Sequence, residues 1–421
     1  MNFAASQQYL YSLGNEVEAM KLGLENIRTL LAELGNAQDE YLKVQVAGTN
    51  GKGSVCAFLD SICGQAGIRR GLYTSPHLVS ITERIKIDGD DISEDDFARL
   101  ATRVRKTAEF LLAEGKLGYT PTYFEQVTAI GLLAFAEAKV ELAILETGLG
   151  GRLDATTAAN AEIAAITQIA LDHQEYLGET IEEIAAEKAA IIREQTKAVV
   201  IGRQSRAVMD VLRGVIEEAY SQGTFVRETA VVFDESALAM PLRSLVGSLS
   251  LRGAHQVANA EIAILIADIL RKYFPITDEN IRTGLNSAIH PGRLEYIDNV
   301  LLDGAHNIAG AKALSDYLTY VEKRPLTMIF GAMRGKDVAE IAEILWPRAE
   351  RLILTQPANS RAMTAEELLE FVPEGFDAET VVKTNSAEDA VAAAGSTELV
   401  LVTGSLYLVG EVKNLLERKQ I

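Results

Sequence analysis

Residues 43–54, KVQVAGTNGKGS, decide the fold of this chain. Val44 and Val46 are typical of a buried strand, and Val55 and Leu59 begin the apolar face of a helix that follows. Between the two lies a glycine-rich loop. Backbone N–H groups in such a loop and the positive end of the helix dipole both attract anions. The stretch therefore predicts a phosphate-binding site between a strand and a helix.

The residues of this loop that are candidates for holding a nucleotide are Gly48, Thr49, Asn50, Gly51, Lys52, Gly53 and Ser54. Lys52 would add a positive charge, and the Ser54 hydroxyl could bind Mg²⁺. The strict pattern G-x-x-x-x-G-K-[ST] is not met, because Val46 takes the place of the first glycine and Gly53 separates the lysine from the serine. A plain glycine turn is the alternative, and a lysine and a serine placed after a strand argue against it.

Length and composition narrow the class of protein. A chain of 421 residues is predicted to form two domains, since single cores stop growing near roughly 250 to 300 residues. The net charge of -19 argues against binding to nucleic acid or to anionic membranes. Cys56 and Cys63 would lie about 10 Å apart on one helix, too far for a disulfide. With no leader pattern and no long apolar run, we expect a cytoplasmic protein.

Polar side chains follow several predicted strands at the point where each strand ends. Ser75 follows one strand, Glu146 ends the next, and His173 follows a third. Ligands of open α/β sheets gather at the carboxyl edge of the strands. These side chains are therefore predicted to share one edge with the phosphate loop, and an acid at a strand end suits a metal.

Lys188 is an anomaly in the helix that is predicted to start after Thr180. The apolar stripe of this helix includes Ile181 and Ile184, and Lys188 lies on the same stripe. A buried lysine needs an anionic partner, a neutral form or a chemical modification. The alternative is that its stem runs along the surface and its ammonium reaches water. The sequence leaves both open.

The domain organisation follows from the order of the predicted elements. Residues 1–290 are predicted to form an α/β nucleotide-binding domain with a mostly parallel sheet, in which 223–251 makes a small β-subdomain. A linker at 291–298 is expected, because proline and glycine interrupt a helical run there. Strands and helices alternate again over 299–421, which predicts a smaller Rossmann-like α/β domain.

A series of motifs makes the chain resemble the folylpolyglutamate synthase/dihydrofolate synthase family of Mur-type amide ligases. In order, they are GTNGKGS at 48–54, TSPHLVSITERI at 74–85, ETGLGGRLDAT at 146–156, LDHQEYLG at 171–178, AAEKAAII at 185–192, GRLE at 292–295 and DGAHN at 303–307. The resemblance covers most of the chain. It identifies GTNGKGS as the amide-ligase variant of the phosphate loop and 299–421 as a glutamate-ligase domain.

The resemblance implies an ATP-dependent ligase. A substrate carboxylate would attack the γ-phosphate of ATP, and the amine of L-glutamate would then displace phosphate from the acyl phosphate to form an amide. The implied acceptor is a folate, dihydropteroate or both. Two Mg²⁺ ions are the implied cofactors, with a monovalent cation left open, and a monomer is the implied state.

The resemblance also assigns catalytic and metal-binding residues. Ser54, Ser75 and Glu146 resemble ligands of one Mg²⁺, and His173 resembles a ligand of a second that would stabilise the acyl phosphate. A capped or core histidine is the alternative for His173. Lys188 matches a lysine that can be carbamylated, which would turn a buried cation into an anion. Lys52, Lys188 and His173 are thus the implied catalytic residues.

Two further groups match ligand-binding positions. Asn259, Arg293, Asp303 and His306 match positions that contact ATP. Thr122, Phe124, Asp154 and Ala155 match positions that line a dihydropteroate pocket in bifunctional members. Phe124 could stack on a flat ring, with plain helix core as the alternative.

Two other functions compete with this interpretation. A cell-wall amino-acid ligase of the same family would share the phosphate loop and metal sites, but the SPHL and GLGGRLDAT segments argue against it. A nucleotide switch would hydrolyse ATP only to change shape, and would need no amino acid.

Overall fold

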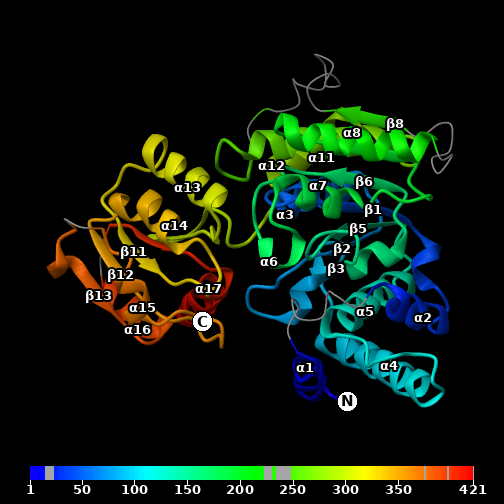
Figure 1. Ribbon diagram of the computed structural model, residues 1–421, viewed down its shortest axis with the longest axis horizontal. Coiled ribbons are helices and arrows are strands. Elements are labelled where there is room, and N and C mark those ends of the chain that lie inside the picture. The colour runs from blue at the N-terminus through cyan, green and yellow to red at the C-terminus, as the bar shows by residue number, and fades with distance from the viewer. Residues whose placement is uncertain are drawn as a thin grey trace. The chain divides into compact units, whose positions relative to one another are not determined.

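The computed structural model describes residues 1–14, 23–221, 230–233, 247, 249–373, 376–395 and 398–420. It divides into two compact units. Figure 1 shows the chain coloured by residue number from the amino to the carboxyl terminus. Unit 1 comprises Met1–His77, Ile81–Ser250 and Val257–Ile289, and unit 2 comprises Leu78–Ser80, Leu251–Gln256 and His290–Ile421.

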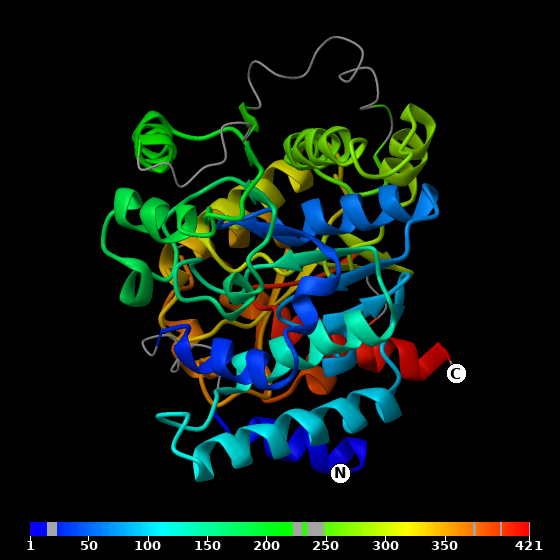
Figure 2. The same ribbon diagram turned by 90° about the vertical axis from the view of Figure 1, so that its right-hand side faces the viewer.

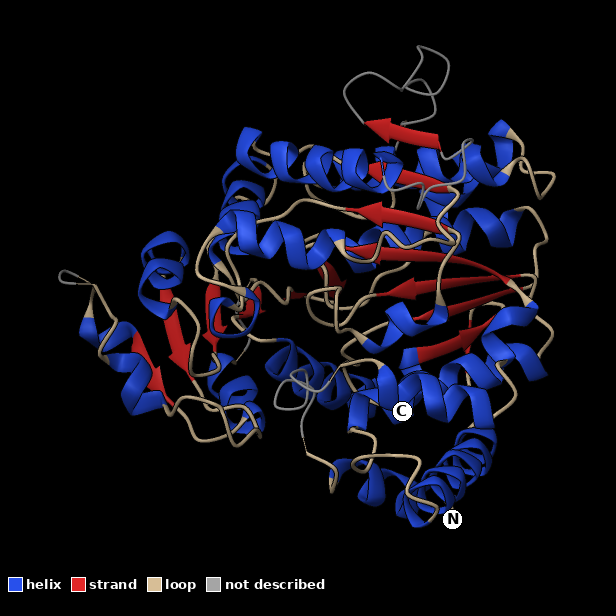
Figure 3. Cartoon of the chain, turned by 45° about the vertical axis from the view of Figure 1, so that its right-hand side comes forward, coloured by secondary structure: helices blue, strands red, loops and turns tan. Residues whose placement is uncertain are grey.

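Unit 1 is built on a sheet of eight strands, counted over the described residues, in the order β4-β3-β2-β5-β1-β6-β7-β8. The strands are β1 Leu42–Ala47, β2 Arg70–Tyr73, β3 Ile85–Ile87, β4 Asp90–Asp91, β5 Leu142–Glu146, β6 Ile163–Ile166, β7 Ala198–Ile201 and β8 Ala230–Phe233. All neighbours pair in parallel except β2 with β3 and β3 with β4. Figure 3 shows these strands as a ladder of arrows, most of which point the same way. The mostly parallel sheet is confirmed.

Helices cover both faces of this sheet, because parallel strands whose residues are all buried must be shielded from water on both sides. Lys43 to Ala47 of β1 are all buried. The α-helices of unit 1 are α1 Phe3–Tyr11, α2 Glu25–Glu33, α3 Lys52–Gln65, α4 Glu94–Ala113, α5 Tyr123–Glu137, α6 Gln174–Leu177, α7 Ile181–Ala189, α8 Arg206–Ser221, α11 Gln256–Leu270 and α12 Asp278–Ser287. Three 3₁₀ helices are described as well: η2 Ala37–Glu40, η3 Ile81–Arg84 and η4 Ala155–Ala159.

Two apolar clusters of unit 1 lie on the same side of the sheet. One joins α2, α4 and α5 to β5, and the other joins α7 and α8 to β6 and β7. Helix α3 packs on β1, β2 and β5, and α12 lies against α3. Figure 2 shows α1 and α4 side by side near the amino terminus. Among the described helices, none combines the length and the apolar character needed to cross a membrane.

Unit 2 contains a sheet of six strands in the order β13-β12-β11-β14-β10-β9, over the residues described. The strands are β9 Glu295–Ile297, β10 Val300–Leu302, β11 Thr327–Phe330, β12 Arg351–Leu354, β13 Val381–Lys383 and β14 Val400–Thr403. The helices are α13 Ile308–Tyr320, α14 Val338–Leu345, η5 Trp346–Arg348, α15 Ala365–Leu369, η6 Ala378–Thr380, α16 Ala387–Ala394 and α17 Leu406–Gln420. Only β9 runs antiparallel to its neighbour among these strands. The second α/β sheet is confirmed.

Two sequence expectations need comment. The linker expected at 291–298 is wrong in part, because Glu295–Ile297 pair with β10 and form the edge of the second sheet. The small β-subdomain expected at 223–251 falls mostly on residues outside the described part of the chain. Of that stretch, Ala230–Phe233 form β8, which extends the main sheet. The assignment of separate functions to 1–290 and 299–421 stays a prediction.

Candidate active site

The phosphate loop, Ser75, Glu146 and the segment before His173 lie at one edge of the first sheet. Strands β2, β5, β1 and β6 are neighbours in the sheet and run in parallel, so their carboxyl ends meet. Glu146 is the last residue of β5, and the loop begins directly after β1. This is the edge at which open α/β sheets bind ligands.

Two glycines let the phosphate loop approach its neighbours. Gly51 has φ 90° at the start of α3, and a Cβ there would lie 2.3 Å from Oδ1 of Asn259. Gly48 has φ 148°, and a Cβ there would lie 1.9 Å from Oγ1 of Thr167. Both positions therefore require glycine. The close approach also places Asn259, a candidate for ATP binding, directly against the loop.

Two lysines meet at one carbonyl of this loop. Lys52 Nζ donates to the carbonyl oxygens of Gly48 and Thr49, both at 3.1 Å. Lys188 Nζ also donates to the oxygen of Gly48, at 3.1 Å. Lys188 is buried on α7, so its ammonium does not reach water as the surface alternative required. The sequence prediction that Lys188 faces the interior is confirmed.

The environment of Lys188 favours its neutral form. Burial, the largest cause, and the charge of Lys52 lower the pKa of Lys188 from 10.5 to about 7, while the carboxylate of Asp172 opposes the shift. A large fraction of Lys188 is therefore uncharged at neutral pH. A neutral amine is nucleophilic, which is the property that carbamylation by CO₂ would need.

The segment that ends at His173 is hydrogen-bonded to the phosphate loop. The Thr49 backbone N–H donates to the oxygen of Gln168, and the Thr49 hydroxyl donates to the oxygen of Ala170 at 3.0 Å. His173 has φ 52° and precedes α6, with its Nε2 3.8 Å from Oδ1 of Asp172. The loop thus holds the segment at the same edge, and the metal role of His173 stays a prediction.

The side chains proposed to bind Mg²⁺ suit a hard cation. The Ser75 backbone N–H donates to Oε2 of Glu146 at 3.2 Å, so the two residues are adjacent. The Ser75 hydroxyl is buried and has no hydrogen-bond partner among the described residues. Ser54 is buried in the first turn of α3. Mg²⁺ prefers oxygen ligands and usually takes only one or two carboxylates beside phosphate oxygens, so these residues fit it.

The four candidates for a pteroate pocket lie on α5 and on the glycine loop after β5. Thr122 caps α5 in a capping box with Glu125, and Asp154 begins η4 by accepting from Thr156 N–H at 3.0 Å. The Phe124 ring lies on the backbone of Gly148, where a Cβ would be 2.5 Å from its Cζ. Ala155 is buried beside Asp154. These residues have structural contacts, and their binding role stays a prediction.

Asp154 is held as an acceptor. Its Oδ2 accepts from the backbone N–H of Leu149 at 2.9 Å, and its Oδ1 accepts from the hydroxyl of Thr156. Burial raises the pKa of Asp154, and the hydrogen bond from the Thr156 side chain opposes that shift.

Three candidates belong to unit 2: Arg293 precedes β9, and Asp303 and His306 follow β10. Asp303 accepts from the backbone N–H groups of Leu294 and Ala305, both at 3.0 Å. Burial raises the pKa of Asp303, and the positive charge of Arg293 opposes that shift. A Cβ on Gly304 would lie 3.0 Å from Nη1 of Arg293, and His306 Nδ1 is 2.8 Å from the oxygen of Gly304. The structure brings these three together, and their contact with ATP stays a prediction.

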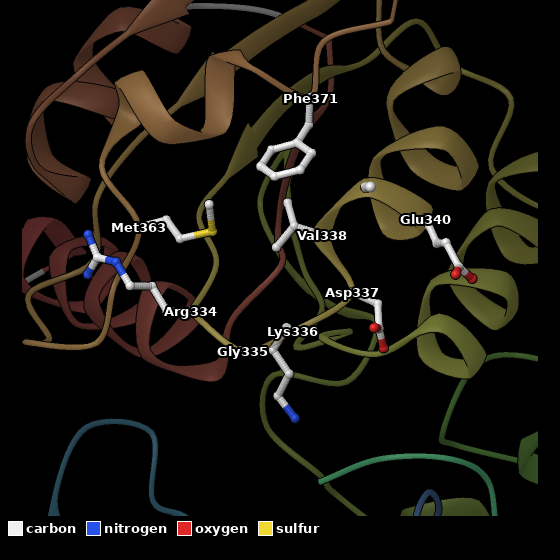
Figure 4. A pocket seen from close by; sticks show the side chains of 9 residues that line it. Arg334, Gly335, Lys336, Asp337, Val338, Glu340, Met363 and Phe371 are labelled. Atoms are coloured by element: carbon white, nitrogen blue, oxygen red, sulfur yellow. The ribbon is translucent and has the colours of Figure 1, made fainter. Parts of the chain in front are cut away.

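Unit 2 also has a pocket of about 320 Å³ at the start of α14, shown in Figure 4. Phe371, Val338 and Met363 give it apolar walls, with Arg334 and Lys336 at its rim. Arg334 is paired with Glu367. The acidic Asp337 and Glu340 also line the pocket, so its charges balance and it has no evident preference for an anion.

Sequence reasoning missed two polar residues that support the site. The Thr167 hydroxyl donates to the oxygen of Asn50 at 2.7 Å and so fixes the phosphate loop. Gln45, within β1, is fully buried and donates to threonines of the glycine loop after β5. A glutamine between two valines of a buried strand was the signal for the second.

Two family models match the chain. The Mur ligase middle domain matches residues 46–267, and the Mur ligase glutamate ligase domain matches residues 292–406. The first alone covers more than half of the chain.

Individual relatives agree with these matches. The dihydrofolate synthase/folylpolyglutamate synthase of Bacillus subtilis is 34% identical, over 94% of this chain and 96% of that protein. A Halobacterium salinarum relative, named a probable bifunctional folylpolyglutamate synthase/dihydropteroate synthase, is 36% identical over 93% of this chain. This chain spans only 49% of the Halobacterium protein, about half its length.

Solved structures show the same fold. Mycobacterium tuberculosis folylpolyglutamate synthase complexed with ADP and AMPPCP has a TM-score of 0.85 and 30% identity, covering 99% of each chain. E. coli FolC in complex with DHPP and ADP has a TM-score of 0.83 and 28% identity, covering 100% of this chain and 99% of that one. A bifunctional enzyme with Mn, AMPPNP and L-glutamate bound has a TM-score of 0.81 and 28% identity, covering 99% of this chain and 98% of that one. With the phosphate loop and its two lysines in place, this chain belongs to the folylpolyglutamate synthase/dihydrofolate synthase family of ATP-dependent Mur-type ligases.

Proposed function

We propose that this ligase adds L-glutamate to a folate and also to dihydropteroate. One observation carries the proposal: the side chains of Lys52 and Lys188 meet at the oxygen of Gly48, beside a strand that ends in Glu146. Such a site suits an ATP whose γ-phosphate is passed to a carboxylate, because Lys52 supplies a cation for the phosphates next to the buried amine of Lys188. The names of the relatives supply the acceptors.

The residues of unit 1 would share the work of the first step. Loop N–H groups from Gly48 to Ser54 and the Lys52 ammonium would bind the phosphates of ATP, with Asn259 next to the loop. Phe124 and Asp154 would hold the pterin ring and so orient the acceptor carboxylate toward the γ-phosphate. Excluding water there would protect the acyl phosphate until glutamate attacks.

Ser54, Ser75 and Glu146 would hold a Mg²⁺, and His173 a second one. Bound Mg²⁺ would neutralise charge on the phosphate groups. The Mn in the relative's structure supports a divalent metal. A monovalent cation stays an open part of the proposal.

Lys188 would act after carbamylation. Its buried position and its pKa of about 7 support reaction of the neutral amine with CO₂, in which the new N–C bond forms and one amine proton is released. The resulting anion next to Lys52 would relieve the repulsion between two neighbouring cations.

Arg293, Asp303 and His306 would contact ATP from unit 2, and L-glutamate would bind to the same unit. The match of residues 292–406 to a glutamate ligase domain supports this division. We also propose that the protein is a monomer and that it is cytoplasmic; the two free and buried cysteines support a reducing compartment.

The test is to incubate the protein with ATP, Mg²⁺ and L-glutamate, offering dihydropteroate or tetrahydrofolate in separate reactions, and to weigh the products by mass spectrometry. A mass increase of one glutamyl residue on both acceptors, with ADP formed in step, is the expected result. Addition to one acceptor alone would remove the other activity. ADP formation with neither product would favour a nucleotide switch and overturn the proposal.

A further inference from the structure

Gln45 is a fully buried polar residue at the centre of the first sheet. It lies opposite Leu145 of β5 and Ala164 of β6 in the sheet register, so all three face the same side. Leu145 belongs to the apolar cluster of α5, and Ala164 to that of α7. Gln45 therefore lies between the two clusters, beneath the glycine loop Thr147–Thr157.

The side chain of Gln45 is hydrogen-bonded only to that loop among the residues described. Its Nε2 lies 2.9 Å from Oγ1 of Thr156, 2.8 Å from Oγ1 of Thr157 and 3.2 Å from Oγ1 of Thr147. Its Oε1 is buried and accepts no hydrogen bond within the described part of the chain. An unsatisfied amide oxygen is costly in a core, so the strand keeps this glutamine at a loss of stability.

The threonine partners fix which way the Gln45 amide points. The Thr156 hydroxyl donates to the carboxylate of Asp154, and the Thr157 hydroxyl donates to the oxygen of Gly151 at 2.8 Å. Carboxylate and carbonyl oxygens only accept, so each hydroxyl has used its proton. Each hydroxyl can then only accept from Gln45, which requires the NH₂ group to face the loop. Two independent contacts give the same orientation.

The glycine loop that Gln45 holds separates the pteroate candidates from the helix of Lys188. On one side, a Cβ added at Gly148 would lie only 2.5 Å from Cζ of the Phe124 ring. On the other side, a Cβ on Gly151 would lie 2.7 Å from the oxygen of Glu187 and 2.9 Å from the oxygen of Lys188. The loop is therefore packed tightly on both sides, and a shift of its base would move Asp154 relative to Phe124.

We propose that Gln45 is a positioning residue for the acceptor substrate, acting through Thr156 and Thr157 to fix Asp154 and the glycine loop. The inference rests on the proposed pteroate pocket at Phe124 and Asp154. Gln45 touches no substrate itself. Its NH₂ group donates to the two threonine hydroxyls, which fixes the base of the glycine loop and with it the position of Asp154 relative to Phe124.

The main variant is Gln45→Met, which keeps the length of the side chain and removes its donors. We expect the KM for dihydropteroate to rise by about tenfold, while the KM for ATP stays near its original value. Thr156→Val should also raise the KM for dihydropteroate and leave the KM for ATP unchanged, without altering β1. Thr156→Ser keeps the hydroxyl and should have the original KM for dihydropteroate. Tyr41→Phe is the matched control, because it removes a buried hydrogen bond of 2.9 Å to Leu132 away from the loop. It should lower the unfolding temperature and leave both KM values unchanged.

A second readout does not depend on turnover. Hydrogen exchange of the amides at 148–157, measured without substrate, should be faster in Gln45→Met and Thr156→Val than in Tyr41→Phe. Unchanged exchange together with an unchanged KM would overturn the positioning role. If Asp154→Ala also left the KM for dihydropteroate unchanged, the pteroate pocket itself would be wrong, and the inference would fall with it. If Gln45→Met does not fold, Thr156→Val decides the question alone.

Discussion

The carboxyl edges of the two sheets hold their charged groups in opposite ways. In unit 1, Lys52 and Lys188 both donate to the backbone oxygen of Gly48. In unit 2, the carboxylate of Asp303 accepts two backbone N–H groups, and Arg293 lies close enough to oppose the rise of its pKa. The first edge brings two lysine amines to one carbonyl oxygen, whereas the second holds a carboxylate by backbone donors beside a guanidinium.

This difference separates an edge that brings two lysine amines together from an edge whose carboxylate already accepts its backbone hydrogen bonds. Two neighbouring ammonium groups repel each other, and the repulsion contributes to the lowered pKa of Lys188. A polyanion such as ATP would remove this repulsion on binding. The Asp303 cluster has its hydrogen bonds already formed, so its residues order the backbone around Leu294 and Ala305 before any ligand arrives.

Replacing Lys52 tests the first edge most severely. Lys52→Ala should lower kcat/KM for ATP by about 100-fold or more, because phosphate charge would lose its nearest cation. Steady-state kinetics with ATP as the varied substrate would measure this. Lys106→Ala, on the exposed face of α4, is the control and should behave as the unchanged protein does. If Lys52→Ala kept full activity, the phosphates of ATP would have to bind away from Lys52.

Replacing Lys188 tests the proposed carbamylation. Lys188→Ala should lose activity by about 100-fold, and added formate or acetate should partly restore it by supplying the missing anion. The readout is the rate of glutamate addition with and without the small carboxylate, with chloride as the salt control. Full activity in the variant would remove the hypothesis.

The stability of the protein should also report the burial of Lys188. The pKa of this lysine is about 7 when folded and 10.5 when exposed, so below pH 7 the folded state must bury an ammonium. That cost falls as the pH rises from 7 to 10.5 and then vanishes. Lys188→Met should therefore be more stable than the unchanged protein by on the order of 4 kcal/mol near neutral pH, with a smaller gap at higher pH.

Denaturant unfolding at several pH values, in buffer freed of CO₂, would measure this gap. A gap that stays constant with pH would contradict the lowered pKa of Lys188.

The smallest expected effect is at the second edge. Asp303→Asn replaces one of two accepting oxygens by an NH₂ group that faces a backbone N–H, which should cost about 1 to 3 kcal/mol of stability. Thermal unfolding would detect the loss. Asp316→Asn, exposed on α13, is the matched control. A loss no larger than that of the control would mean that Asp303 does not organise this edge.

Local patterns were sufficient to predict most elements. All strands of the second sheet except β9, and the helices between them, follow from the local pattern of apolar residues, because that pattern depends only on neighbours in the chain. The helix start after Thr180 and the buried face of Lys188 were predicted in the same way and are confirmed. The phosphate loop was also predictable, since its glycines, lysine and strand are contiguous in the chain.

Long-range packing limited the rest. Leu78–Ser80 belong to unit 2 although they follow β2 in the chain. The reason is visible at Gly410 of α17, where a Cβ would lie 2.0 Å from the oxygen of Leu78. No local period predicts such a contact, because the partners are far apart in the sequence. Glu295–Ile297 were likewise expected to be linker and instead complete a sheet edge.

The sequence by itself determined most of the strands and helices, the phosphate loop and the placement of Ser75, Glu146 and His173 at or after strand ends. It did so because these features depend on neighbours in the chain. Only the tertiary structure decided that Lys188 reaches the oxygen of Gly48, and that Gln45 holds the loop of Asp154. Each of these contacts joins residues about a hundred or more positions apart, and only the packing of helices on the sheet brings such residues into hydrogen-bonding distance.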